Sequence, residues 1–401
     1  MVECMPSKGE EDGVRPGIEI LLADSSHLVS GRRVGLITNH TGRTRDQTHS
    51  IDLLLSHGVE ISALFGPEHG IRGNVPEPEP SGTADEGVEP VRDVEEVSGL
   101  PVYSLYGETL KPTLEMLSGI ELLLFDIQDI GARYYTYVST MALAMQAAAE
   151  HGITFVVLDR PNPIGGDLVQ GNVLEVEHAS FVGLYPVPMR HGMTVGELAL
   201  LFNDRFEIGA DLHVIRAAGW RRGMWFDQSG LPWVDPSPNM PSLESATHYP
   251  GTCLFEGTNL SVGRGTEQAF QQIGAPWLDG VALAERLNGY ELPGVRFEAV
   301  SFTPEGPHDR KYNSELVNGV RFVATDRDVY DPTLAAVAAL IEARRLAGKR
   351  WEWIPGHFDR LAGTTHLRER IEAGAQLDDV TSQWADLLEA FLQLRARYLL
   401  Y

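Results

Sequence analysis

The sequence is poor in cysteine and has no long apolar run. Only Cys4 and Cys253 occur among 401 residues, which is too few for a disulfide framework or a four-thiolate zinc site. No run approaches the ~18–20 apolar residues that cross a bilayer, so we expect no membrane span. The N-terminus lacks a basic region followed by an apolar one, so no secretory signal is visible. We expect a cytoplasmic chain as written, or an exported one if a leader has been removed.

Basic residues are also scarce relative to acidic ones. The chain has 32 Lys and Arg against 56 Asp and Glu, which gives a net charge of −24. Such a chain repels phosphate backbones and anionic membranes, so we expect no nucleic-acid partner. Hydrophobic residues make up 43% and charged residues 22%, which is typical of a globular protein. The length predicts two domains, or about three small ones.

The first half alternates short apolar runs with helical patterns. Strands that are apolar throughout, with helices between them, indicate a parallel α/β sheet covered on both faces. A mixed α+β sheet is the alternative. The predicted strands are 33–38, 60–65, 101–106, 121–125 and 154–158, and the predicted helices are 46–57, 109–117 and 136–151.

Residues 70–99 are rich in proline and acidic residues and interrupt this rhythm. A loop of that length is either a solvated acidic insertion or a lid over the strand ends. The pattern changes after about residue 206, so we place the domains at 1–207 and 208–401, the second with a helical C-terminus. Its predicted strands are 211–215, 295–302 and 319–325, and its predicted helices are 278–287, 332–347, 358–373 and 378–398.

Polar residues follow four of the predicted strands at the point where each strand ends. Asn39 follows the first strand, and Glu68, His69 and Arg72 follow the second. Asp159 follows the strand at 154–158. Because ligands bind outside the carboxyl ends of the strands in an open parallel sheet, these residues predict one site. The strand at 121–125 contributes the most, namely Asp126, Gln128, Asp129, Arg133, Tyr134 and Tyr135.

Motifs for common cofactors and nucleophiles are missing. The chain has no G-x-G-x-x-G loop after the first strand, no P-loop, no G-x-S-x-G elbow and no H-E-x-x-H helix. Glu68 and His69 with Asp126 offer metal-ligand chemistry, but adjacent residues on an extended segment point in opposite directions. We therefore expect no cofactor and no metal.

The remaining chemistry is that of carboxylates among sugar-binding side chains. Glu68 lies in a turn bounded by Gly66 and Gly70, where a shielded carboxylic acid is able to act as a general acid. Asp126 and Asp129 supply further carboxylates. We expect these three acids to be the catalytic residues.

Arginine and tyrosine side chains complete the predicted site. Arg72, Arg133 and Arg190 are fork donors that suit a substrate carboxylate, and the alternative for each is an ion pair with an acidic residue. Tyr134 and Tyr135 either stack on a sugar ring or pack in the core.

Three later segments, 188–194, 237–241 and 253–266, combine glycine or proline with polar residues. Glycine in the third lets the backbone approach a ligand, and the alternative is a plain irregular connection. From these segments we expect five substrate-binding residues, His191, Asn239, Glu256, Asn259 and Arg264.

Together the motifs resemble a known family, the NamZ-type exo-β-N-acetylmuramidases, formerly a bacterial domain of unknown function. The matching strings follow the family's order over about residues 33–270. They are GLITNHTG (35–42), LFGPEHGIRG (64–73), LPVYSLYG (100–107), FDIQDIGARYYTYVSTM (125–141), VLDRPNPIGG (157–166), PMRHGMTVGELA (188–199), SPNMP (237–241) and CLFEGTNLSVGRGT (253–266).

The resemblance implies a Rossmann-like parallel-sheet domain and a second, smaller α/β domain, with the active site in the cleft between them. It implies release of N-acetylmuramic acid (MurNAc) from the non-reducing end of peptidoglycan fragments. The expected partners are therefore MurNAc-containing saccharides or muropeptides. Many family members are exported, and this chain departs from them in having no visible leader.

Two alternatives of other classes remain. A non-catalytic protein that binds muropeptides or aminosugars is possible on the same fold, because fold alone does not fix function. A nucleotide-dependent enzyme is disfavoured because the phosphate loop is missing. The presence of Glu68, Asp126 and Asp129 favours the glycosidase.

Overall fold

The computed structural model of the chain describes residues 13–72, 92–94 and 98–401. Most of the acidic segment 70–99, for which we predicted an insertion or a lid, lies outside the described residues. No helix within those ranges has the length and apolar character needed to cross a membrane.

A seven-stranded sheet forms the first domain, in the order β3-β4-β2-β1-β5-β6-β9. Every neighbouring pair is parallel except β3 with β4, which confirms the predicted parallel α/β sheet. The strands are β1 (Arg33–Thr38), β2 (Glu60–Gly66), β3 (Arg92–Val94), β4 (Pro101–Ser104), β5 (Leu122–Asp126), β6 (Thr154–Leu158) and β9 (Leu212–Ile215).

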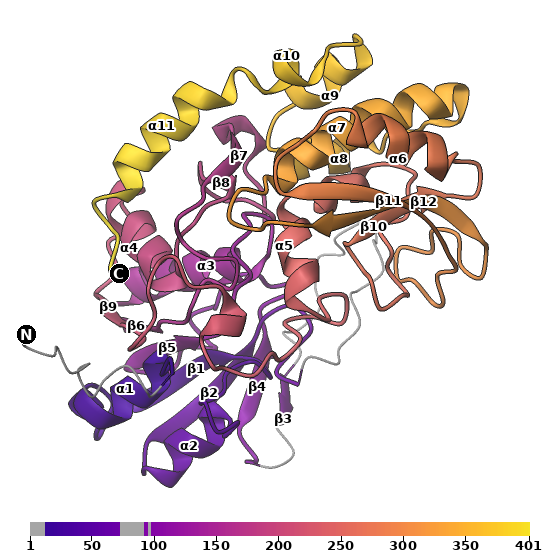
Figure 1. The fold of residues 1–401 in the computed structure, drawn as a ribbon. Coiled ribbons are helices and arrows are strands. Elements are labelled where there is room, and N and C mark those ends of the chain that lie inside the picture. Colours follow the sequence, from indigo (N-terminus) through magenta and orange to yellow (C-terminus); the bar gives the residue numbers. More distant parts are fainter. Residues whose placement is uncertain (1–12, 73–91, 95–97) are drawn as a thin grey trace, which may run out of the picture.

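Both faces of the sheet are covered. Along β5, Leu123 and Phe125 belong to the core on one face, whereas Leu122 and Leu124 belong to the core on the other. Because side chains alternate along a strand, a strand buried on both faces is apolar at every position. One face carries the first two helices and the other carries the next two (Figure 1). These helices are α1 (Gly17–Asp24), α2 (Ser50–Ser56), α3 (Tyr137–His151) and α4 (Val195–Arg205).

Some predicted helices are wrong. Residues 109–117 form turns, because Pro112 disfavours helix at the residue before it. The predicted helix 358–373 is divided at Gly363, which adopts a positive φ of 70°. The predicted helix 378–398 is likewise two helices, α10 (Leu377–Thr381) and α11 (Trp384–Arg395).

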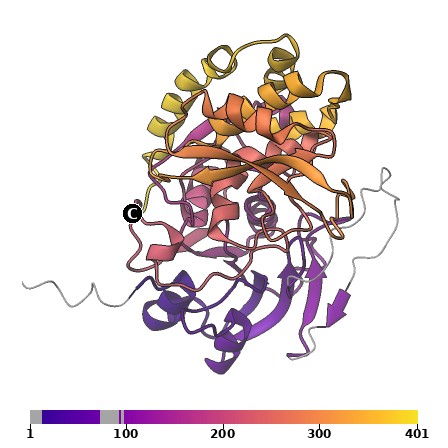
Figure 2. The same cartoon turned by 45° about the vertical axis from the view of Figure 1, so that its right-hand side comes forward.

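The second domain has a three-stranded antiparallel sheet in the order β10-β12-β11, with helices packed beside it (Figure 2). A two-stranded ribbon, β7 (Gln170–Val173) with β8 (Pro188–Arg190), lies along the chain between β6 and β9 of the first sheet. The boundary at 207/208 stays a prediction, and β9 follows it yet joins the first sheet. The second-domain elements are α5 (Leu243–Thr252), β10 (Gln272–Ala275), α6 (Gly280–Asn288), β11 (Val295–Phe302), β12 (Val317–Ala324), α7 (Pro332–Ala347), α8 (Pro355–Ala362) and α9 (His366–Glu372).

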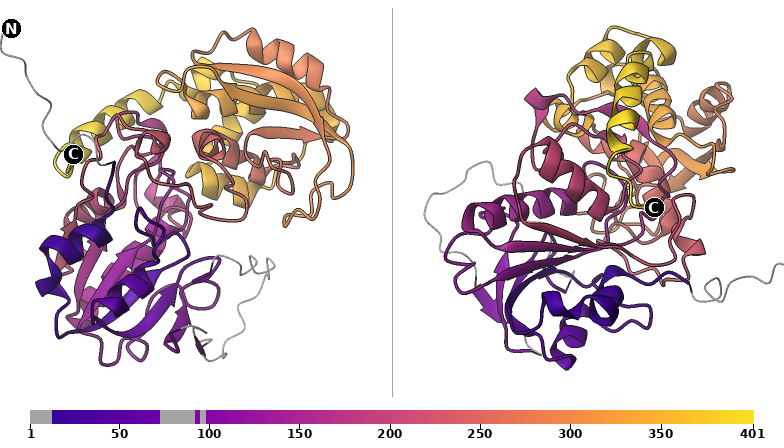
Figure 3. Two further views of the ribbon diagram at one scale, coloured as in Figure 1. Left: turned by 60° about the horizontal axis from the view of Figure 1, so that its bottom comes forward. Right: turned by 90° about the vertical axis from the view of Figure 1, so that its left-hand side faces the viewer.

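The last helix, α11, returns from the second domain to the first (Figure 3). Arg395 near its end donates to the carbonyl oxygens of Gly166 (2.9 Å) and Gly192 (2.8 Å). Beyond the helix, the hydroxyl of Tyr401 donates to Oδ2 of Asp159 at 2.8 Å. The C-terminal residues therefore attach to the sheet directly after β6.

Asp159 is a fully buried carboxyl at the first turn of α4. It also accepts hydrogen bonds from Thr194 Oγ1 and from the Gly196 backbone N–H, both at 2.8 Å. Burial raises the pKa of Asp159 to about 6, although these hydrogen bonds act in the opposite direction.

We predict that Asp159→Asn removes a pH dependence of stability. A folded pKa of about 6 against an ordinary 3.8 means that the native state binds this proton more tightly than the unfolded chain. The free energy of unfolding therefore falls as pH rises from about 4 to about 6, by up to about 3 kcal/mol for a shift of this size. Urea unfolding of both proteins across this range measures the slope, and parallel curves would contradict the prediction.

Candidate active site

The turn after β2 presents Glu68 at the carboxyl edge of the sheet. His69 and Gly70 both adopt positive φ, 68° and 71°, and the Gly70 N–H donates to the Pro67 carbonyl at 2.9 Å. This tight turn leaves Glu68 half-buried, with Oε2 accepting a hydrogen bond from Thr136 Oγ1 at 2.5 Å. Thr136 precedes α3, so the turn after β2 and the loop after β5 meet at this carboxyl.

Tyr135 and Tyr137 are both within electrostatic reach of Glu68 and of Asp129. Tyr135 and Tyr137 pack edge to face with ring centroids 5.0 Å apart. Burial is the main cause of the raised pKa of Tyr137, and the charges of Glu68 and Asp129 raise it further. The same two carboxylates contribute to the raised pKa of Tyr135, after burial and the charge of Tyr137. The structure thus brings Glu68 and Asp129 to one cluster.

Asp129 is buried, and one of its two carboxylate oxygens has no hydrogen bond within the described ranges. Its Oδ2 accepts from the Gly131 N–H at 2.7 Å and lies 3.7 Å from Nε2 of His191. Its Oδ1 is buried without a hydrogen-bond partner among the described residues. Gly131 has a φ of 85°, and a Cβ there would lie 2.4 Å from Oδ1 of Asn162. Only glycine therefore fits the turn that supplies this N–H.

Asp126 is held in a closed ion pair instead. Its Oδ1 lies 2.6 Å from Nε of Arg160 and its Oδ2 lies 3.0 Å from Nη2 of the same side chain. The hydroxyl of Ser50 also donates to Oδ2. Both carboxylate oxygens are therefore occupied, and Asp126 is fully buried. This geometry favours a structural role over the catalytic role that we predicted from the sequence.

The amides of Asn39 and Gln128 lie on the same edge of the sheet. Asn39 Oδ1 accepts from the N–H and the hydroxyl of Thr41, at 3.0 and 2.6 Å. Its Nδ2 is buried with no hydrogen bond among the described residues. Gln128 donates to the carbonyl oxygens of Asp129 and Pro161, both at 2.8 Å, so its amide nitrogen is already committed to the backbone.

Two of the three predicted arginines are buried among backbone carbonyls. Arg133 donates to Asn172 and Val187 on the first-domain side, at 2.9 and 3.0 Å. It also donates to Leu361 and Ala362 at the end of α8, both at 2.9 Å. Burial lowers the pKa of Arg133 to about 10. Its terminal nitrogens are therefore used to join the loop after β5 to the second domain.

Arg190 is similarly committed. It donates to the side chain of Gln170 at 2.9 Å and to the carbonyl of Ile164, and burial lowers its pKa to about 10. Arg72, in contrast, is exposed. Burial is the main cause of the lowered pKa of His49, and the charge of Arg72 contributes to it. Arg72 therefore lies within electrostatic reach of the N-terminus of α2, at the carboxyl edge of the sheet.

The predicted tyrosines form part of the contact between the two domains. The hydroxyl of Tyr134 donates to the carbonyl of Pro250 in α5. The rings of Tyr134 and Tyr135 each pack against Tyr249, with centroids 5.7 Å apart. Tyr134 is thus a packing residue, whereas the hydroxyl of Tyr135 is buried near Ser237 without a hydrogen bond of good geometry among the described residues.

The candidates of the second domain are an ion pair, Glu256 with Arg264, and two asparagines, Asn239 and Asn259. Glu256 and Arg264 bind each other, with Nη2 and Oε1 2.6 Å apart. Burial is the largest single influence and acts to raise the pKa of Glu256, but Arg264, His357 and Lys311 together lower it, and the net shift is downward. The amide of Asn259 bonds to the backbone of 350–352, away from Glu68. Asn239 is half-buried in the loop that supplies the Pro236 carbonyl to the Tyr137 hydroxyl at 2.6 Å.

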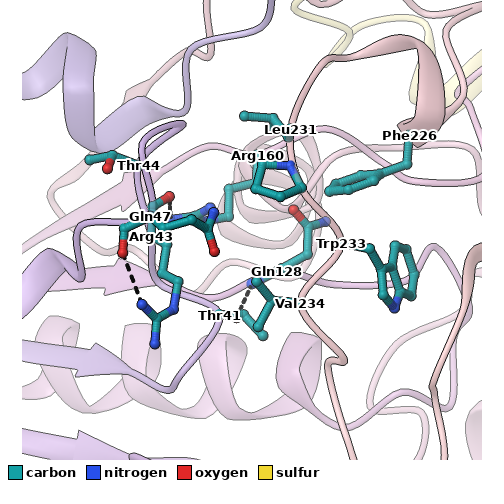
Figure 4. A pocket seen from close by; sticks show the side chains of 11 residues that line it. Thr41, Arg43, Thr44, Gln47, Gln128, Arg160, Phe226, Leu231, Trp233 and Val234 are labelled. Carbon is teal, nitrogen blue, oxygen red and sulfur yellow. Dashed lines mark hydrogen bonds between the residues drawn. The ribbon is translucent and has the colours of Figure 1, made fainter.

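A small pocket with a volume of about 20 Å³ lies beside Thr41 and Gln128 (Figure 4). Thr41, Gln128 and Arg160 border it on the sheet side, and Phe226 and Trp233 border it on the other. That volume is enough for about one water molecule and too small for a sugar ring. This pocket is therefore not the place where a sugar ring binds.

Sequence reasoning missed Arg160, Thr136 and Ser237. Arg160 was detectable in principle, because β5 and β6 are neighbours and the residues that follow them lie close together. Thr136 binds Glu68, and Ser237 is one of the groups that influence the pKa of Tyr135. Within the described ranges, no three His, Cys, Asp or Glu side chains gather as metal ligands.

Comparisons with known proteins assign nearly the whole chain to one family. Residues 34–244 match the family model described as exo-beta-N-acetylmuramidase NamZ, N-terminal, and residues 247–401 match its C-terminal counterpart. The peptidoglycan beta-N-acetylmuramidase NamZ of Bacillus subtilis (strain 168) is 46% identical over 390 residues, which are 97% of this chain and 91% of that protein.

Two crystal structures of DUF1343 family proteins from Bacteroides fragilis NCTC 9343 have the same fold. One has a TM-score of 0.88 at 37% identity, and the alignment covers 97% of this chain and 99% of that one. The other has a TM-score of 0.75 at 32% identity with the same coverage.

We predict that Asp126→Asn destabilises the protein by about 3–5 kcal/mol, because it leaves Arg160 buried without a carboxylate. Chemical denaturation of wild type and variant measures this difference. Asp126→Leu combined with Arg160→Met removes both charges and should recover part of the loss. An unchanged unfolding midpoint in Asp126→Asn would contradict the structural role.

Proposed function

The chain belongs to the exo-β-N-acetylmuramidase NamZ family, and we infer that it is an exo-acting glycoside hydrolase. It releases MurNAc from the non-reducing end of peptidoglycan fragments. The family match over both domains and the 46% identity to the Bacillus subtilis enzyme support this function. The compartment, the absence of a nucleic-acid partner and the absence of a cofactor or metal stay predictions.

The observation that carries the mechanism is the placement of Glu68. Thr136 occupies its Oε2, which leaves Oε1 without a partner among the described residues. A carboxylic acid held in this way is able to give its proton to the glycosidic oxygen as the bond to the anomeric carbon breaks. Glu68 is therefore the proposed general acid.

Asp129 is the proposed second carboxylate. Glycosidases commonly place a pair of carboxyl groups at the bond they cleave. Of the two aspartates that we predicted, Asp126 has both oxygens in the pair with Arg160, whereas Asp129 keeps Oδ1 open. Its negative charge is suited to the positive charge that develops at the anomeric carbon.

The polar groups around these carboxylates support sugar binding. Tyr135 OH, near Ser237 and Tyr137, and Asn39 Nδ2, near Tyr137, are buried without a hydrogen bond of good geometry among the described residues, and buried polar groups are normally hydrogen-bonded. Hydroxyl and acetamido groups of an aminosugar supply such partners. His69, Gln128 and Asn239 lie on the adjoining turns and stay proposed binding residues.

MurNAc differs from GlcNAc by a lactyl group that carries a carboxylate. A protein with a net charge of −24 repels such a substrate at long range, so a local cation is needed. The nitrogens of Arg133 and Arg190 are largely bound to backbone and Gln170. Arg72 is exposed and follows Glu68 by four residues, and it is the proposed partner of the lactyl carboxylate.

We predict that Glu68→Gln lowers kcat by about 10²–10⁴-fold, because glutamine cannot donate a carboxyl proton. The loss should be largest on a disaccharide with a poor leaving group and smaller on a nitrophenyl MurNAc glycoside, which needs less protonation. Glu60→Gln, an exposed position at the start of the same strand, is the matched control. Near-wild-type kcat on the disaccharide would disprove the role of Glu68.

We predict that Arg72→Ala lowers kcat/KM about ten- to a hundred-fold on MurNAc substrates and has little effect on the matching GlcNAc substrates. The reason is the loss of a charge-assisted contact to the lactyl carboxylate. Parallel assays on both sugars measure the selectivity, with exposed Arg221→Ala as the control. Equal losses on both sugars would show that selectivity comes from the shape of the pocket.

A further inference from the structure

Asp129 and His191 each have a buried polar atom without a partner at the same place. Asp129 is 5% exposed and His191 is 1% exposed. Oδ1 of Asp129 and Nε2 of His191 form no hydrogen bond among the described residues. Buried polar atoms in native proteins are normally satisfied, so the pair is arranged for an interaction that the free protein does not complete.

The tautomer of neutral His191 follows from its other nitrogen. The backbone N–H of Met193 donates to Nδ1 at 3.2 Å, so Nδ1 acts as an acceptor and a neutral ring carries its proton on Nε2. That nitrogen faces Oδ2 of Asp129 at 3.7 Å. The distance is longer than a hydrogen bond, and catalytic hydrogen bonds are often long in a free enzyme and shorten in the substrate complex.

The orientation of the carboxylate depends on its Oδ2. The Gly131 N–H holds this oxygen from the loop after β5, and His191 approaches the same oxygen from the segment between β8 and α4. A hydrogen bond from His191 would hold Oδ2 from a second side and so fix the direction of Oδ1. It remains the oxygen available to a sugar.

The side chains that interact electrostatically with Asp129 differ from those that interact with Asp126. Asp126 is paired with a permanent cation, Arg160. The groups that share a charge interaction with Asp129 are His191, Tyr135 and Tyr137, and the same tyrosines interact with Glu68. His191 is therefore the side chain that approaches the Asp129 carboxylate, whereas Arg160 binds that of Asp126.

We propose that His191 is a positioning residue for hydrolysis. Its Nε2–H closes onto Oδ2 of Asp129 when substrate binds, which fixes the orientation of the carboxylate and directs Oδ1 to the reacting sugar. This inference rests on the proposed function and adds to it a residue that does not itself touch the reacting atoms.

The experiment compares two substitutions of His191 in the full chain. His191→Gln retains an N–H donor near the position of Nε2, whereas His191→Leu removes it. The control is His213→Gln, because His213 lies 3.7 Å from Oδ1 of Asp211 in a solvent-exposed pair on β9. Kinetics on a nitrophenyl MurNAc glycoside give kcat and KM from about pH 4 to 9, and thermal unfolding shows whether each variant is folded.

The expected result is a fall in kcat of about 10–100-fold for His191→Leu, the scale of a misplaced catalytic group, with KM changed by less than about threefold. The acidic limb of its kcat/KM profile moves to higher pH, because the ionised carboxylate has lost a donor. His191→Gln retains most of the activity and the wild-type profile, and the control is unchanged. In an Asp129→Asn background, His191→Leu has no further effect.

Equal losses in the two His191 variants, an unmoved acidic limb in His191→Leu, or additive losses with Asp129→Asn would each overturn the proposal. If His191→Leu does not fold, a folded His191→Gln with kcat reduced more than about 100-fold also overturns it. A wild-type protein that leaves the MurNAc glycoside uncleaved would instead refute the proposed function. The two failures are therefore distinguishable.

Discussion

The carboxyl ends of β5 and β6 are held together by the ion pair of Asp126 and Arg160, which is almost completely buried. Ser50 at the start of α2 binds the same carboxylate, and Arg160 also donates to the carbonyl of Arg43 at 3.0 Å. Two strand ends, a helix and a loop thus share one pair of charges. Breaking such a pair leaves an uncompensated charge in a low dielectric, so these segments hold their positions together or lose them together.

The loop after β5 depends on this fixed edge. It leaves Asp126, turns at Gly131, passes Arg133 and reaches Thr136 beside Glu68. Arg133 ties the middle of the loop to α8 through two carbonyls. The same short segment therefore carries Asp129, supports Glu68 and contacts the second domain, and the proposed catalytic geometry is a property of both domains.

Much of this arrangement could be predicted from local sequence. The apolar run 33–38 coincides with β1, and the polar strand ends do place Asn39, Glu68 and Asp129 in one region, because parallel strands share an edge. The sequence could not separate Asp126 from Asp129, which are three residues apart, because Arg160 comes from the next strand. It also could not show that Arg133 is committed, since its partners Leu361 and Ala362 are more than 220 positions away.

The return of α11 to the first domain has a mechanical consequence. The chain crosses from the first domain to the second between β9 and α5, and it crosses back between α10 and α11. Two crossings define a line, and rotation about that line is the relative motion that stretches neither connection. The rings of Tyr135 and Tyr249, one from each domain, pack edge to face with centroids 5.7 Å apart. A change in the angle between the domains would thus alter the packing of a ring that belongs to the proposed site.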